Sequence, residues 1–273
     1  MPKLSMTSDF AADGGSPEQP LRAIARTGFT HVHWCHHWNT DFIYTEPEID
    51  QIARWLEETG LTLVDLHGSS GVEKRWTSRH AWQRLAGVEL VRNRIEMTAR
   101  LGGHAVVMHA SPEPDPADGE PVIPQPLRRS LDELQPVAEK AGVRLAIENG
   151  DVHLISALLA EYPPSYLGLC YDAGHGTMAG DGLDHLERLA DRLIVVHLHD
   201  NDGTSDQHNN PFTGRGDWDR LAGILARSPY RGPVTLESNL RGLDTAPEAF
   251  LHQAFEAARR LAEMIDQDAG KQT

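Results

Sequence analysis

The sequence places imidazole and carboxylate side chains directly after short apolar runs. The clearest case is the segment 193–208, LIVVHLHDNDGTSDQH, which begins with four apolar residues and ends in histidines and aspartates. A β-branched run of this kind is typical of a strand buried on both faces. His197 and His199 are two residues apart, so on a strand their side chains point to the same side. The segment therefore predicts a strand that delivers imidazoles to a functional site.

Other apolar runs in the chain end in the same way. Besides His197, the residues at these ends are His67, His109, Glu148, Asp172 and Glu237, and the adjoining loops supply His175, Asp206 and His208. Imidazole nitrogens and carboxylate oxygens are metal ligands, and a set without thiolate suits Mn, Mg, Co, Zn or Fe. A single strand-end histidine is more often an ordinary polar residue, and Asp172 could instead cap the turn at Gly174. Six ends of one chemical class favour a divalent-metal site.

Apolar runs alternate with longer amphipathic segments along the whole chain. We expect strands at 3–8, 30–34, 61–66, 105–108, 143–147, 167–171, 193–196 and 233–236. We expect helices at 20–27, 46–59, 79–101, 127–141, 151–162, 181–192, 217–227 and 247–266. This alternation in 273 residues matches an α/β fold of the (β/α)8 TIM-barrel type, which typically has about 250 residues. The carboxyl ends of barrel strands meet at one mouth, where the candidate ligands would converge.

No domain boundary interrupts this alternation, so we expect a single barrel domain over residues 1–273. The alternative fold, a doubly wound nucleotide-binding sheet, would need a GxGxxG turn, which the sequence lacks. Six prolines between 111 and 126 predict a loop on the catalytic face, because proline interrupts helices and sheets. The polar tail at 267–273 is expected to be disordered.

The composition limits the partners and the compartment. Lys and Arg number 25 and Asp and Glu 40, which gives a net charge of −15. Such a surface repels phosphate backbones and anionic membranes, so we expect neither nucleic acid nor membrane as a partner. Cys35 and Cys170 are too few for a disulfide framework. The first ten residues do not resemble a signal peptide, and no apolar run approaches the roughly 20 residues of a membrane span. We expect a cytoplasmic protein.

Four segments carry a resemblance to a known family. They are LAIEN at 145–149, YDAGH at 171–175, VHLHD at 196–200 and YRGPVTLE at 230–237. Together, in this order and at these strand positions, they resemble the xylose-isomerase-like TIM-barrel superfamily, the sugar phosphate isomerase/epimerase group. The resemblance covers nearly the whole chain. It implies one divalent metal bound by Glu148, Asp172, His197 and Glu237.

The related endonuclease IV family binds three metals. Its additional ligands are similar to His67, His109, His175, Asp206 and His208, so the number of ions stays open between one, two and three. Two departures separate the possibilities. The ketose 3-epimerases carry a second Glu shortly after the first metal Glu, whereas this chain has NGDVHL at 149–154. The acidic and neutral residues at 112–125 and the net charge of −15 oppose binding to bent DNA.

The resemblance and the residues together predict a metal-dependent isomerase or epimerase of a sugar, sugar phosphate or polyol. Glu148 and Glu237 lie on different strands and could remove and return a proton through an enediolate. We expect Trp34, His36, Trp38, His175 and His199 to contact this small carbohydrate substrate. A multinuclear phosphoesterase of the endonuclease IV type and a sugar or cyclitol dehydratase are the alternatives. The sequence leaves a homo-oligomer open.

Overall fold

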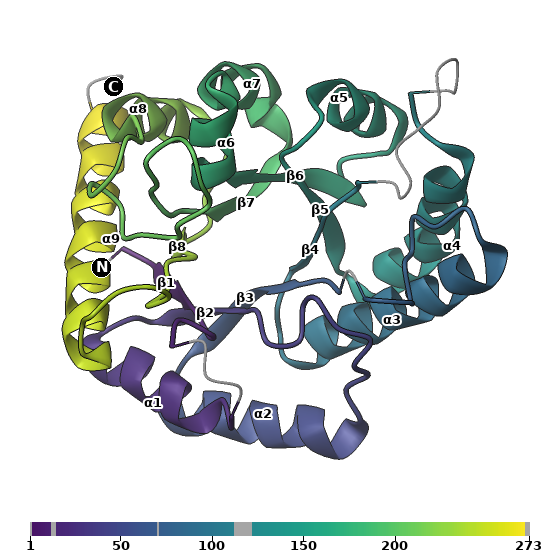
Figure 1. Ribbon diagram of the computed structural model, residues 1–273, viewed down its shortest axis with the longest axis horizontal. Helices are drawn as coiled ribbons and strands as arrows, with labels where there is room; N and C mark the ends of the chain where they lie inside the picture. Colours follow the sequence, from purple (N-terminus) through teal and green to yellow (C-terminus); the bar gives the residue numbers. More distant parts are fainter. Residues whose placement is uncertain (1, 12–14, 70, 112–121, 271–273) are drawn as a thin grey trace.

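Eight parallel strands form the centre of the molecule. The computed structural model describes residues 2–11, 15–69, 71–111 and 122–270. The strands are β1 (Leu4–Thr7), β2 (His31–Trp34), β3 (Thr62–His67), β4 (Ala105–Met108), β5 (Arg144–Glu148), β6 (Leu167–Asp172), β7 (Leu193–His197) and β8 (Val234–Leu236). They pair in the order β7-β6-β5-β4-β3-β2-β1-β8 (Figure 1). The predicted TIM barrel is therefore confirmed.

The barrel closes between β7 and β8 through the residue that follows β7. Leu198 forms an isolated parallel bridge with Leu236. Its backbone N–H donates to the carbonyl of Thr235 at 2.9 Å, and the N–H of Glu237 donates to the carbonyl of Leu198 at 3.1 Å. This short seam lies between His197 and Glu237, two of the candidate ligands.

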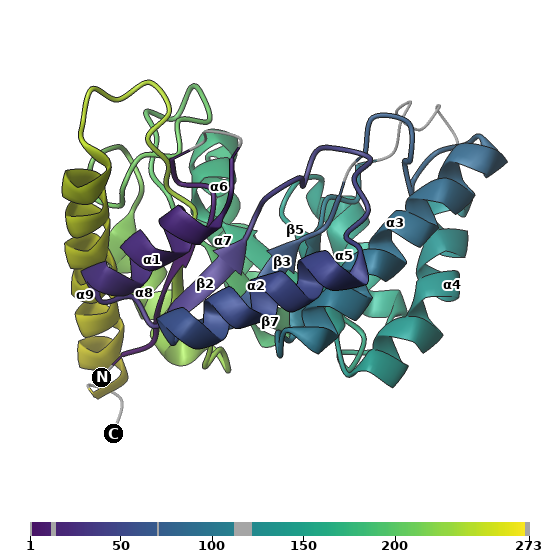
Figure 2. The same ribbon diagram turned by 90° about the horizontal axis from the view of Figure 1, so that it is seen from below.

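Helices surround the strands (Figures 1 and 2). They are α1 (Glu18–Thr27), α2 (Glu46–Thr59), α3 (Ala81–Arg100), α4 (Gln125–Ala141), α5 (Val152–Glu161), α6 (Ala173–Ala179), α7 (Gly182–Leu189), the 3-10 turn η1 (Ala190–Arg192), α8 (Trp218–Arg227) and α9 (Pro247–Gly270). In the described part of the chain, none of them combines the length and the apolar character of a membrane span.

Two helices of the structure differ from those predicted. Helix α6 was not expected, because its sequence contains two glycines; the side chain of Asp172 caps its first turn by accepting from the N–H of His175. Helix α9 continues to Gly270, beyond the expected end of the helix at residue 266. The side chains of its last turns are mostly exposed, so the apolar pattern in the sequence did not indicate where the helix ends. Most of the predicted proline-rich loop, at 112–121, lies outside the described residues.

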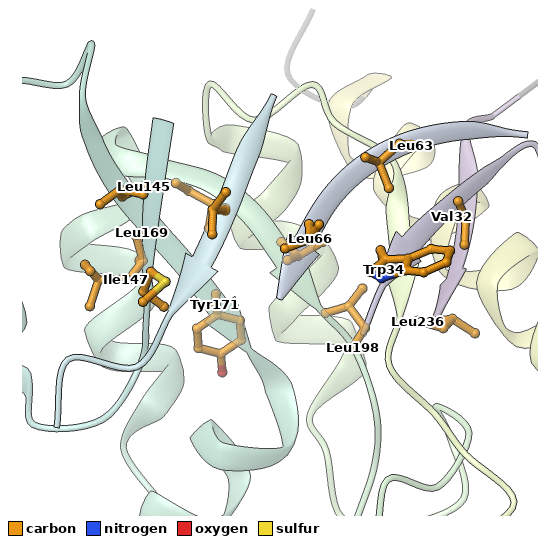
Figure 3. Close-up of a cluster of buried hydrophobic side chains, with 14 of the residues drawn as sticks. Val32, Trp34, Leu63, Leu66, Leu145, Ile147, Leu169, Tyr171, Leu198 and Leu236 are labelled. Carbon is orange, nitrogen blue, oxygen red and sulfur yellow. The ribbon is translucent and has the colours of Figure 1, made fainter. Parts of the chain in front are cut away.

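Strand alternation divides the buried side chains into two sets. One set faces the helices and forms the main core, which includes the residues labelled in Figure 3: Val32, Trp34, Leu63, Leu66, Leu145, Ile147, Leu169, Tyr171, Leu198 and Leu236. A second, small apolar cluster consists of Ala105, Val107, Ala146, Cys170, Ile194 and Val195. Buried polar side chains lie mainly on the other strands, with Ser5 on β1, His33 on β2, Asp65 and His67 on β3 and Thr235 on β8, and with His197 at the end of β7. The barrel interior is thus unusually polar on the side of β1, β2, β3 and β8.

Gly87 provides a test of the packing beside β3. A Cβ on this α3 glycine would lie 2.2 Å from the backbone nitrogen of Trp76. We expect Gly87→Ala to lower the free energy of unfolding by about 1–3 kcal/mol, because backbone cannot give way as a flexible side chain can. The control is Gly223→Ala in α8, where a Cβ would meet only side-chain atoms, at 3.3 Å and beyond. That change should raise the free energy by roughly 0.5–1 kcal/mol. Urea unfolding of both variants measures the difference, and equal effects would contradict it.

Candidate active site

The candidate ligands gather at the carboxyl ends of the strands. His67, Glu148, Asp172 and His197 are the last residues of β3, β5, β6 and β7. His109 and Glu237 follow β4 and β8 directly, and His199 lies two residues beyond His197. Asp172 and His197 are paired in register on neighbouring strands, so their side chains face the same side. The structure thus brings the predicted set to one mouth of the barrel.

Glu148 is the centre of the first group of contacts. Its Oε2 lies 3.1 Å from His109 Nε2 and 3.5 Å from His67 Nε2. Its Oε1 lies 3.3 Å from His197 Nδ1. The carboxylate is only 3% exposed, so these three imidazoles provide most of its polar surroundings. This carboxylate could join two neighbouring cation sites.

Glu237 faces the same imidazole from the other side. Its Oε2 lies 3.3 Å from His197 Nδ1, and its Oε1 lies 3.5 Å from His33 Nε2. The ligand atoms of Glu237, His199 and His208 also lie within 4.8 Å of one another. Glu237 therefore links the first group to the histidines of the loop after β7.

A second group surrounds Asp172 and Asp206. Asp172 Oδ2 lies 3.0 Å from His199 Nε2, and Asp206 Oδ2 lies 3.0 Å from His208 Nε2. His175 lies between the two carboxylates, with Nε2 3.6 Å from Asp206 Oδ2 and Nδ1 3.8 Å from Asp172 Oδ1. The predicted region of His67, His109, Asp206 and His208 is thus divided between two groups, on either side of Glu148 and Asp172.

His208 is held in an unfavourable backbone conformation. Its φ of 51° lies in the left-handed region, which residues other than glycine rarely adopt. Its Nδ1 donates to the carbonyl of Glu237 at 2.7 Å, and its ring stacks on His199 with centroids 3.9 Å apart. Backbone strain of this kind concentrates at functional sites. The contacts fix the Nε2 atom of His208 toward Asp206.

A buried layer beneath these groups was not predicted. Asp65 is fully buried, and its Oδ1 contacts both His33 Nδ1 and, at 3.4 Å, His197 Nε2. His33 in turn reaches Glu237. A charged residue inside the apolar run of β3 was the available signal, because a strand buried on both faces rarely carries an unpaired carboxylate. This layer holds His197 from below.

The charges of the two groups shift one another strongly. Burial alone would raise the pKa of Glu148, but the imidazoles of His109, His197 and His67 outweigh it and hold that pKa well below its usual range. Burial likewise opposes ionisation of Glu237, yet His197 and His33 keep its pKa well below normal. Burial lowers the pKa of His109, and the nearby Glu148 only partly offsets this. The site therefore keeps both glutamates ionised.

The outer histidines of the site behave in the opposite way. Burial disfavours the charged form of His175, but Asp172 and Asp206 raise its pKa to about 10. Burial also opposes protonation of His208, and its bond to Asp206 raises its pKa to about 9. Asp172 and Asp206 therefore stabilise positive charge at this edge of the site, and they would stabilise a bound cation in the same way.

The predicted substrate contacts divide into two kinds. Trp38 is partly exposed, with its ring 4.9 Å from that of His67 and 6.0 Å from that of His109, so it lies at the mouth. Trp34 does not: it is 1% exposed, and its Nε1 donates to the hydroxyl of Tyr44 at 2.9 Å within the core (Figure 3). The expectation for Trp34 is therefore wrong, because alternation along β2 sends it away from the barrel interior. His36 is half-buried and bonded to the carbonyl of Ser8.

The fold and site define a (β/α)8 barrel with a carboxylate- and histidine-rich mouth. Residues 21–266 match the family described as the xylose isomerase-like TIM barrel, and the chain belongs to this family. The uncharacterized protein y4fM of Sinorhizobium fredii is 33% identical to it over 274 residues, which cover 90% of this chain and 88% of that protein.

Solved structures share the fold over its whole length. A D-tagatose 3-epimerase-like protein has a TM-score of 0.78 at 20% identity, covering 99% of this chain and 100% of that one. L-Ribulose 3-epimerase has a TM-score of 0.80 at 18% identity, with 100% and 98% covered. The IolI protein with a bound zinc atom has a TM-score of 0.70 at 16% identity, with 97% and 98% covered. At these identities the likeness establishes the fold.

Asp65 provides a test of the buried layer. Asp65→Asn removes the negative charge between two buried imidazoles, and we expect it to lower the free energy of unfolding by about 3–5 kcal/mol, as breaking a buried charge pair does. Asp184→Asn is the control, since Asp184 pairs with Arg220 at the exposed surface and should leave stability nearly unchanged. Urea unfolding measures both. An unchanged free energy of unfolding in Asp65→Asn would show that the two histidines do not depend on this carboxylate.

Proposed function

We propose that this protein is a divalent-metal-dependent isomerase or epimerase of a sugar, sugar phosphate or polyol. The observation that carries the proposal is the pair of buried carboxylates, Glu148 and Glu237, which approach His197 Nδ1 at 3.3 Å each from different strands. Two bases that flank one point suit the transfer of a proton off and onto carbon. Family membership supports the proposal, as do the epimerases among the proteins of similar fold.

The donor set fits a divalent ion. Glu148, Asp172, His197 and Glu237 would hold it, with His197 binding through Nδ1. Its other nitrogen faces Asp65 at 3.4 Å, and metal-binding histidines commonly present their second nitrogen to a carboxylate. Glu148 Oε2 is buried and, although His109 Nε2 lies 3.1 Å away, no described donor meets it in hydrogen-bond geometry, as expected of an atom that binds a cation. Such an ion supplies Lewis-acid polarisation of a carbonyl and its neighbouring hydroxyl.

The protein's own residues would move the proton. One of Glu148 and Glu237 removes it from the carbon beside the carbonyl, which leaves an enediolate, and the other returns it. Their lowered pKa values keep both carboxylates in the deprotonated form that a general base requires. Trp38 would cover the substrate from the β2 side and exclude water. His175, which is 28% exposed, is positioned to hold a proton of a substrate hydroxyl.

The residues after Glu148 favour a substrate other than a free ketose epimerised at carbon 3. Asn149 is bonded through its side chain to the backbone of Asp172. Asp151 uses its carboxylate to cap α5, accepting from the N–H groups of His153 and Leu154. Neither is free to replace the second glutamate that the ketose 3-epimerases carry. The same two glutamates also suit a substrate with its carbonyl at another position, or a dehydratase reaction that expels water.

A multinuclear phosphoesterase remains the second candidate because imidazole pairs flank the proposed ion site. His67 and His109 contact Glu148 on one side, and His175 and His208 contact Asp206 on the other. Each group could hold an additional cation. The net charge of −15 opposes a DNA substrate. The number of bound ions is therefore the property that separates the two candidates.

The first test of the proposal is Glu237→Gln. We expect the variant to fold and to catalyse proton exchange about 10²–10⁴-fold more slowly than the parent, because an amide cannot act as a general base. Exchange is measured by NMR as deuterium incorporation beside the carbonyl, with a panel of sugars and sugar phosphates in D2O and manganese present. Glu263→Gln, which removes an exposed carboxylate from α9, serves as the control. Retained exchange in Glu237→Gln would remove this residue from the mechanism.

The second test counts metal ions. Elemental analysis of protein purified without chelator should give about one ion per chain for a mononuclear isomerase and two or three for a multinuclear enzyme. If His109 and His208 belong to additional cation sites, His109→Ala and His208→Ala each bind fewer ions than the parent, because His109 contacts Glu148 and His208 contacts Asp206. If both variants bind as many ions as the parent, these histidines contact substrate and the multinuclear candidate fails.

A further inference from the structure

The amino ends of the strands collect positive charge, opposite to the candidate active site. Lys3, Arg192 and Arg231 precede β1, β7 and β8, and Arg144 is the first residue of β5. All four line one cavity of about 530 Å³, which also includes His31 and His104. This is the end of the barrel at which β1 begins and α9 ends (Figure 2). Asp191 is the one carboxylate among the lining residues in the described part of the chain.

Two of these cations have a structural role. Arg192 donates to the backbone carbonyls of Tyr162 at 3.0 Å and Leu167 at 2.7 Å. Arg231 donates to the carbonyls of Ser228 at 2.8 Å and Tyr230 at 2.6 Å. These bonds fix both guanidinium groups to the wall of the cavity, and because carbonyls are neutral, both groups keep their positive charge.

The other two cations have no such role. Arg144 is half-buried, and within the described residues its side chain makes no hydrogen bond and no ion pair. Lys3 likewise has no acidic partner there, and its charge acts on the neighbouring His31. Burial lowers the pKa of Arg144, so its position is an electrostatic cost that no described protein group offsets. The amino end of a TIM barrel ordinarily serves stability alone, which does not require this arrangement.

The concentration of cations is unusual for this chain. With 40 acidic and 25 basic residues, a random set of charged neighbours would be mostly acidic, yet four cations and one carboxylate line this cavity. Like charges brought together repel one another unless an anion compensates them. The planar donors of arginine match the oxygens of a phosphate group.

We propose that this cavity is a binding site for a small molecule that carries a phosphate group. Arg144 and Lys3 supply the free donors, and Arg192 and Arg231 supply fixed positive charge behind them. The volume lies within the range of small-molecule sites, about 300–1,000 Å³, and exceeds what a single phosphate ion fills. The site is separate from the carboxyl-end mouth, so it does not depend on the proposed isomerase function.

Calorimetric titration in dilute Tris chloride tests the site, with inorganic phosphate, ribose 5-phosphate and acetate as probes. We expect ribose 5-phosphate to bind more tightly than acetate, and Arg144→Gln and Lys3→Gln each to weaken it at least tenfold. Arg54→Gln, which removes an exposed arginine bonded only to Gln51, should bind like the parent. If inorganic phosphate binds as tightly as ribose 5-phosphate, the ligand is the free ion, and the proposal of a larger phosphate-carrying molecule fails.

Three further results would overturn the proposal. The first is unchanged affinity in both Arg144→Gln and Lys3→Gln. The second is acetate binding as tightly as the phosphate probes. The third is a loss of affinity in His109→Ala equal to that in Arg144→Gln, since the anion would then bind at the carboxyl-end mouth. Thermal unfolding without ligand checks that each variant folds. If Arg144→Gln does not fold, Lys3→Gln still tests the proposal, because Lys3 is exposed and its replacement leaves the core intact.

Discussion

The arrangement of the mouth depends on the contact of Asp65 with two histidines inside the barrel. A buried carboxylate is costly unless cations and hydrogen bonds compensate it. His33 and His197 provide this compensation. Both also contact the glutamates at the mouth: His33 contacts Glu237, and His197 contacts both Glu148 and Glu237. Acidic and imidazole side chains thus alternate from the interior to the mouth, and a change at any level alters the groups on either side of it.

The interior can hold this polar column because its two sides differ in composition. Small apolar residues such as Ala105, Ala146 and Cys170 fill the side of β4 to β6. Serine, threonine, histidine and aspartate side chains occupy the side of β1, β2, β3 and β8. The helices pack against the outward-facing residues of the strands, so the outer core and the polar interior are built from different side chains. This division lets one fold tolerate many buried charges.

The barrel and the residues at its mouth could be predicted because strand ends follow from local patterns. Apolar runs, glycine stops and the polar residues after each run are all readable along the chain. Asp65 and His33 escaped prediction because their importance lies in contacts between strands that are distant in sequence. Trp34 was misplaced because a pocket was inferred from sequence proximity, whereas alternation sends it to the opposite face from His33. Helix α6 begins with a cap from Asp172, and that cap outweighs the poor propensity of its glycines.

The closure of the barrel has a consequence for how the protein is made. Strand β1, at the start of the chain, pairs with β8, near its end, and the N–H of Val234 donates to the carbonyl of Lys3. Because synthesis proceeds from the amino end, a nascent chain carries Glu148, Asp172 and His197 before Glu237 has been added. A growing polypeptide would then lack one of the two proposed bases until β8 emerges from the ribosome. Under the proposed mechanism, incomplete or truncated products would be catalytically silent, whatever part of the barrel they had already formed.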